Sequence, residues 1–202
     1  MEWLMYVLSD LVGYILGNFS FAYIYGKIAD KRDIRDVGSG NAGTTNMMRT
    51  YGKKVGFATF FADALKGVGA VLLGRLIAGE FGGYIGAVMV IIGHIWPVLM
   101  GFRGGKGIAT TAGLLLTIYP LEGLVLLVFC LILIVLFKYV SVASLVGCLG
   151  VMAISFIFAP GNIVQNICFT LISLLCIFSH RENIKRLIKG NENKLIFSKL
   201  KP

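Results

Sequence analysis

Charge is scarce in this sequence, and long apolar runs take its place. Charged residues make up 14% of the 202 residues and hydrophobic residues 57%, a balance well outside that of soluble domains. The composition therefore predicts an integral membrane protein. The formal net charge of +9 does not indicate nucleic-acid binding, because the basic residues gather in short loops between apolar runs. We expect no nucleic-acid partner.

Cysteine pairs, clustered carboxylates and a basic leader are also lacking. The four cysteines lie inside apolar segments, and no two have the CxxC spacing of a metal or redox site. We interpret them as packing residues and expect neither a metal nor a cofactor. Before the first apolar run there is an acid, Glu2, and no Lys or Arg, unlike the start of a cleavable signal peptide. We expect the first helix to be retained.

Familiar catalytic signatures are missing as well. The HxxxxD relay of many acyltransferases would need Asp where the sequence has Leu99 or Lys185. No GxSxG elbow or HExxH pair occurs. The phosphate-binding pattern GxxxxGK[ST] fails at Met100 and Gly107. The sequence therefore offers no obvious nucleophile or base of its own.

What the sequence does contain is a series of apolar runs, each near the 20 residues that span a bilayer as a helix. They predict an all-α membrane protein, a polytopic bundle of about seven transmembrane helices in a single domain, 1–202, with a flexible basic tail at about 190–202. We expect a monomer. The predicted spans lie near 4–26, 55–78, 81–101, 106–119, 121–138, 142–159 and 162–179.

The loops between these runs differ in charge. Most Lys and Arg residues fall on one side, and the other side has only Arg75 nearby, with Glu80 and Glu122. The positive-inside rule puts the N-terminus outside and the C-terminus in the cytoplasm. Within the second run, Asp63 and Lys66 share a helix face; they either pair with each other or support a site. Asp10 receives no functional interpretation.

Polar residues gather in three islands, all predicted at the cytoplasmic side: SGNAGTTNMMR at 39–49, GHIWPVLMGFRGGKGIATT at 93–111, and HRENIKR at 180–186. In the first island, glycines permit unusual backbone angles, and hydroxyls, amides and Arg49 can bind an oxyanion. The composition suits a phosphate. A Gly/Asn-rich turn that caps the next helix is the equal alternative.

The second and third islands carry the same ambiguity. Lys106 follows two glycines at a helix entrance, which suits an anion but also a headgroup anchor. His94 is more typical of a structural histidine than of a catalytic one. His180 and Asn183 share a helix face and can donate to an oxyanion, unless they only cap a juxtamembrane helix. Ser141 reaches the same membrane side.

Taken together, the islands resemble the three cytoplasmic motifs of a known family, the bacterial acyl-phosphate:glycerol-3-phosphate acyltransferases, PlsY. DALKG at 63–67 and KYVSVAS at 138–144 also look like family segments. The resemblance covers nearly the whole chain. Small departures are Arg103, where a lysine is common, and Thr44, where a small residue is common.

The resemblance implies transfer of a fatty acyl group from acyl phosphate to the 1-hydroxyl of glycerol 3-phosphate, giving lysophosphatidic acid and phosphate. By motif position, Ser39, Arg49 and Lys106 would hold glycerol 3-phosphate. Ser141, His180 and Asn183 would hold the acyl-phosphate group and the developing oxyanion, and with Lys106 they are the expected catalytic residues. The cradle would be shaped by Gly40, Asn41, Thr45, Asn46, Gly104, Gly105 and Gly107.

This interpretation places a multi-pass enzyme in the bacterial cell membrane, in contact with membrane lipids, with its active site on the cytoplasmic side. Docking of a soluble acyl-phosphate synthase is left open. A transporter of an organic phosphate is the main alternative, although transporters usually show repeats and broken helices near the midplane. A scaffold protein with lipid-binding loops would explain the charge bias but not the three islands.

Overall fold

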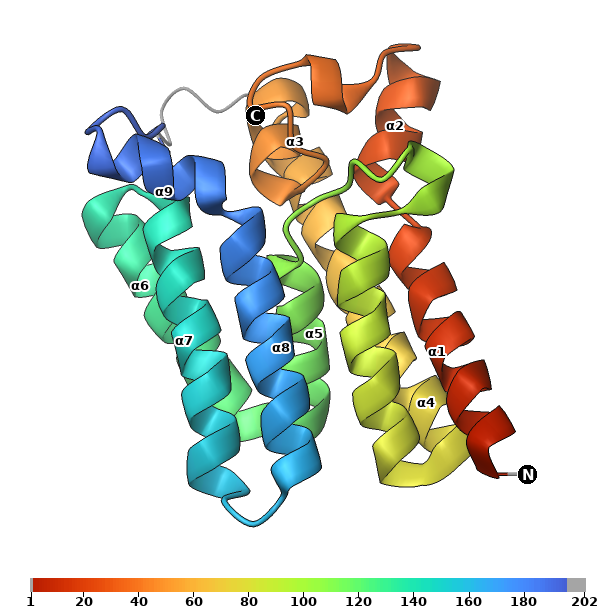
Figure 1. Cartoon of the computed structure of the whole chain (residues 1–202). Helices are drawn as coiled ribbons and strands as arrows, with labels where there is room; N and C mark the ends of the chain where they lie inside the picture. Colours follow the sequence, from red (N-terminus) through yellow and green to blue (C-terminus); the bar gives the residue numbers. More distant parts are fainter. Residues whose placement is uncertain (1, 196–202) are drawn as a thin grey trace.

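The computed structural model describes residues 2–195, and its regular structure in that range is entirely helical. The long helices run alongside one another, and the shorter helices α2, α3 and α9 lie at one end of the bundle (Figure 1). The helices are α1 (Glu2–Asn18), α2 (Phe21–Ala29), η1 (Ile34–Asp36), α3 (Thr44–Tyr51), α4 (Lys53–Ile95), η2 (Val98–Met100), α5 (Ile108–Ile118), α6 (Pro120–Phe137), α7 (Val140–Phe158), α8 (Ile163–Ser179) and α9 (Arg181–Ile188).

Helix α4 reverses direction in its middle. Ala78 and Gly79 leave helical geometry, and Gly79 has a φ of 64°, in the left-handed region that glycine adopts without strain. The two halves then return side by side (Figure 1). Gly82 lies against the backbone of Gly74, because small residues let helix backbones approach closely. The predicted runs 55–78 and 81–101 correspond to these two halves.

Helix α1 packs along the second half of α4 through further small residues. Gly13 lies against Gly86, and Gly17 against Gly93. The predicted first span, 4–26, lies within a stretch, 2–29, that is long and apolar enough to cross a membrane, but the helix is broken there: α1 ends at Asn18, and Ser20 caps a new helix by accepting the N–H of Tyr23. Breaking the helix frees carbonyl groups near its end.

Lys66 binds the carbonyl groups freed at this break. Its ammonium donates to Gly17 O at 3.3 Å and Phe19 O at 2.8 Å, and it pairs with Asp63 Oδ1 at 2.9 Å. Both charged side chains are buried. Of the two interpretations of Asp63 and Lys66, pairing is confirmed, but Lys66 also fixes the end of α1.

The core lies between α4, α5 and α8, where Val71, Ile91, Leu114, Phe169 and Ile172 are fully buried. By contrast, α6 exposes most of its apolar side chains, as a lipid-facing helix does. In residues 2–195, four stretches are long and apolar enough to cross a membrane: 2–29, 53–100, 120–137 and 140–158. If the pair α8 and α9, which is bent by 56°, is counted as one span, it makes a fifth. The protein is an all-helical integral membrane protein.

Candidate active site

All three islands lie at the end of the bundle that carries α2, α3 and α9 (Figure 1). Lys106, in the loop before α5, donates a hydrogen bond from Nζ to Oδ1 of Asn183 on α9. Burial lowers the pKa of Lys106 to about 8, and the positive charges of Arg186 and Arg49 act in the same direction. Lys106 is therefore mostly charged at neutral pH and lies among other cations.

The loop that carries Lys106 follows the end of α4 closely. The N–H of Gly105 donates to His94 O at 3.0 Å, and that of Gly104 to Ile95 O at 3.1 Å. A side chain at either glycine would collide with His94. These two N–H groups hold the loop and are not available to an anion. The N–H groups of the first turn of α5 remain, since helix N-termini leave them without intrahelical partners.

His94 connects this loop to the buried ion pair. Its Nδ1 lies 3.6 Å from Asp63 Oδ1. Its Nε2, at the opposite edge of the ring, packs against Gly105. Asp63, Lys66 and His94 thus form a buried support beneath the loop. The structural interpretation of His94 agrees with this position.

His180, between α8 and α9, is buried and oriented by the backbone. Its Nδ1 lies 2.8 Å from Cys176 O, and because a carbonyl can only accept, Nδ1 carries the proton and Nε2 a lone pair. Burial and then the positive charge of Lys106 lower the pKa of His180 to about 4. The ring is neutral at neutral pH. Nε2 can therefore accept a hydrogen bond, whereas the sequence analysis expected it to donate.

Glu192 joins the site from the chain that follows α9. Asn183 Nδ2 donates to Glu192 Oε1 at 2.6 Å, and Arg186 Nε to Oε2 at 2.8 Å. Burial raises the pKa of the Glu192 carboxyl, but these hydrogen bonds outweigh it and hold the pKa below its usual value. Asn183 therefore bridges an anion and a cation, Glu192 and Lys106.

Sequence reasoning missed Glu192 because it lies in the polar stretch expected to be flexible. In the structure, residues 191–195 pack back onto the bundle, since Leu195 is buried and its N–H donates to Lys138 O at 2.7 Å. Residues 196–202 lie outside the described range. A single acid among basic residues gave no signal in the sequence.

Ser141 and Arg49 complete the cluster from two other elements. Ser141, in the first turn of α7, is buried, and its hydroxyl lies close enough to Glu192 to help lower the pKa of that carboxyl. Arg49, on α3, donates to Asn193 O at 3.3 Å. The structure thus gathers Arg49, Lys106, Ser141 and Asn183 around one carboxylate, with His180 next to Lys106.

The first island is organised around the side chain of Asn46. Asn46, 1% exposed, accepts the N–H of Ser39 at 2.8 Å. Its amide nitrogen donates to the carbonyl groups of Ile34 at 3.1 Å and Val37 at 2.9 Å. The side chain is committed to the loop, which fits a cradle-shaping role. Ser39 and Gly40 are exposed on that loop, and Asn41 and Thr45 are half-buried.

Comparisons with known proteins show which family the chain belongs to. Residues 7–190 match the family described as glycerol-3-phosphate acyltransferase. A glycerol-3-phosphate acyltransferase of Thermoanaerobacter pseudethanolicus is 46% identical over 190 residues, 94% of this chain and 95% of that protein. One from Clostridioides difficile is 42% identical, over 96% and 98% of the two chains. This chain belongs to the glycerol-3-phosphate acyltransferase family.

Solved structures give the same result for this acyltransferase. The crystal structure of PlsY, an integral membrane glycerol 3-phosphate acyltransferase, in its glycerol 3-phosphate form matches with a TM-score of 0.89 and 32% identity, covering 95% of this chain and 96% of that one. The lysophosphatidic acid form matches with a TM-score of 0.86 and 31% identity, covering 96% and 97%. The family resemblance found in the sequence is confirmed.

Proposed function

We propose that this acyltransferase moves a fatty acyl group from acyl phosphate to the 1-hydroxyl of glycerol 3-phosphate, releasing lysophosphatidic acid and phosphate. The observation that carries the proposal is the convergence of Arg49, Lys106 and Arg186 near a single carboxylate, Glu192. Both substrates are phosphate anions, and cations that outnumber their counterions provide a site for them. The PlsY structures were solved in glycerol 3-phosphate and lysophosphatidic acid forms, which supports this substrate and product.

The reaction needs no covalent enzyme intermediate. The glycerol hydroxyl oxygen bonds to the acyl carbon, the bond from that carbon to the phosphate oxygen breaks, and the hydroxyl proton passes to a phosphate oxygen of the substrate. Acyl phosphate is a mixed anhydride with a good leaving group, so the protein mainly aligns two anions. Alignment supplies about 7–11 kcal/mol, and one oxyanion donor about 3–4 kcal/mol.

The residues take separate roles in this proposal. Arg49, Lys106 and Ser39 hold glycerol 3-phosphate, and Ser141 and Asn183 hold the acyl phosphate and its oxyanion. His180 accepts a hydrogen bond from the attacking hydroxyl through Nε2 and so orients it. Its pKa of about 4 makes it a weak base, which favours a phosphate oxygen as the proton acceptor. His180 as the base is the competing version.

The membrane arrangement belongs to the same proposal. The reversal at Ala78 and Gly79 divides α4 into two crossings, and with α1, α5, α6, α7 and α8 this makes seven. The basic end is then cytoplasmic and the N-terminus outside. The acyl chain lies among the apolar helices and so stays out of water, where exposing each methylene would cost about 0.8 kcal/mol.

The test is acyl transfer by the purified protein in lipid, with labelled glycerol 3-phosphate and either palmitoyl phosphate or palmitoyl coenzyme A. We expect labelled lysophosphatidic acid from the acyl phosphate only. Product from coenzyme A alone would overturn the donor. No product from either, together with uptake of glycerol 3-phosphate by vesicles, would favour a transporter.

A further inference from the structure

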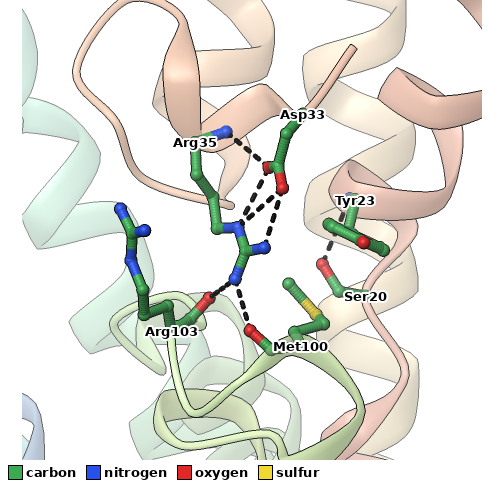
Figure 2. Close-up of polar contacts among 6 residues, drawn as sticks. All are labelled: Ser20, Tyr23, Asp33, Arg35, Met100 and Arg103. Carbon is green, nitrogen blue, oxygen red and sulfur yellow. Dashed lines mark hydrogen bonds and ion pairs between the residues drawn. The ribbon is translucent and has the colours of Figure 1, made fainter. Parts of the chain in front are cut away.

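Arg35 connects the first island's loop to the loop that carries Lys106. It lies in η1, just before the first island, and its Nη1 donates to Met100 O at 2.5 Å and to Arg103 O at 2.9 Å (Figure 2). Arg103 takes part through its backbone carbonyl group (Figure 2). One side chain therefore holds two points of a distant loop.

Asp33 holds the guanidinium of Arg35 in place. Nε of Arg35 lies 2.9 and 3.1 Å from the two carboxylate oxygens, and Nη2 lies 2.7 Å from Oδ2. The backbone N–H of Arg35 donates to Asp33 Oδ1 at 2.9 Å. The guanidinium carbon Cζ lies over the ring of Tyr23, 5.1 Å from the ring centroid. The exposed fractions of the Arg35 and Asp33 side chains are 13% and 14%.

These contacts leave Arg35 unsuited to binding a substrate anion. Asp33 neutralises its charge, and the hydrogen bonds leave at most one N–H of Nη2 uncommitted. Its position beside an anion site therefore has another explanation. A planar fork that reaches a carboxylate and two carbonyl groups at once is a geometry that arginine offers and lysine does not.

The turn that Arg35 holds is strained. Gly101 and Phe102 have φ angles of 63° and 59°, in the left-handed region that is unfavourable for a bulky residue such as phenylalanine. Met100 and Arg103, whose carbonyl groups Arg35 binds, flank these two residues. The clamp therefore sits across the strained turn, and Lys106 follows it by a few residues.

We propose that Arg35 is a positioning residue for glycerol 3-phosphate binding, because it clamps the Met100–Arg103 turn and so sets the place of Lys106 relative to Arg49. The inference rests on the proposed function, which assigns glycerol 3-phosphate to Lys106 and Arg49. Asp33 is the second half of the clamp. Losing the clamp loosens the loop while His180, Asn183 and Ser141 stay in place on other elements.

The experiment compares Arg35→Lys, Asp33→Asn and a matched control, Arg32→Lys, which makes the same change at an exposed arginine. We expect Arg35→Lys to raise KM for glycerol 3-phosphate by about tenfold or more, since hydrogen bonds to charged groups are strong. The kcat should change by less than about threefold, and KM for acyl phosphate should stay unchanged. Asp33→Asn should have the same effect, more weakly, and Arg32→Lys none.

Two further measurements do not depend on turnover: the affinity for glycerol 3-phosphate, measured by calorimetry, and the thermal unfolding midpoint, Tm. Weaker binding by Arg35→Lys at an unchanged Tm supports the clamp. An unchanged affinity and KM, or an equal loss of kcat/KM for both substrates together with a lower Tm, would overturn it. If the wild-type protein binds glycerol 3-phosphate but transfers no acyl group, the proposed function fails and the binding comparison still decides the clamp.

Discussion

The two ends of this bundle both bury polar side chains, but they do so in opposite ways. At the end away from the islands, Tyr84 donates to Gln165 Oε1 at 2.7 Å, Gln165 donates to Tyr119, and Ser155 donates to Asn166 Oδ1 at 2.6 Å. All of these groups are neutral, and they bond to one another. In the cluster around Glu192 at the island end, three cations face one carboxylate.

The difference separates a structural network from a site. The neutral network joins the second half of α4 to α7, α8 and the α5–α6 junction, and a network whose members satisfy one another rigidifies a fold without attracting a ligand. Charges without matching counterions are costly in a membrane protein and indicate function. Changes at the island end should therefore affect catalysis, and changes at the other end should affect stability.

The largest effect is expected at Lys106. Lys106→Ala removes the cation that links the second island to Asn183, and we expect kcat/KM for glycerol 3-phosphate to fall by about 10³-fold, as with loss of a charged oxyanion donor. Steady-state acyl transfer measures it. Lys189→Ala, at an exposed position near the same end, is the control and should lose little. A loss of less than tenfold would remove Lys106 from the site.

The pH dependence tests the same charge without a mutation. A lysine loses its proton as pH rises through its pKa, and that of Lys106 is about 8. We therefore expect kcat/KM, which reports the free enzyme, to fall about tenfold per pH unit above that value. Lys106→Arg should keep its charge and abolish the decline. An unchanged decline in this variant would assign it to another group.

His180 should matter less than Lys106 if it only orients the hydroxyl. We expect His180→Gln, which can still accept a hydrogen bond, to lower kcat by about tenfold, whereas loss of a general base costs about 10²–10⁴-fold. Because its pKa is about 4, protonation of His180 should not lower kcat/KM between neutral pH and pH of about 5, and a decline in that range that His180→Gln shares would belong to a substrate phosphate. A loss near 10³-fold would favour the histidine-base version.

The sequence predicted the apolar helices well and the site only in part. The runs 121–138 and 162–179 agree closely with α6 and α8, because bilayer thickness sets the length of a spanning helix. The break after Asn18 and the site position of Glu192 depend on contacts between residues far apart in the chain: Lys66 binds Phe19, and Arg49 binds the carbonyl group of Asn193, next to Glu192. No local pattern encodes such contacts.

The smallest catalytic effect is expected in the neutral network. Gln165→Leu removes a hydrogen-bond partner of both Tyr84 and Tyr119. It should lower Tm and reduce the free energy of unfolding by about 1 kcal/mol, since polar contacts inside membrane proteins are individually modest. Acyl-transfer rates and KM should stay within about twofold of wild type. Tyr84→Phe, which removes one donor, should lower Tm less. If Gln165→Leu changed KM for glycerol 3-phosphate at an unchanged Tm, the two ends would be coupled, and their separation into structural and functional regions would be wrong.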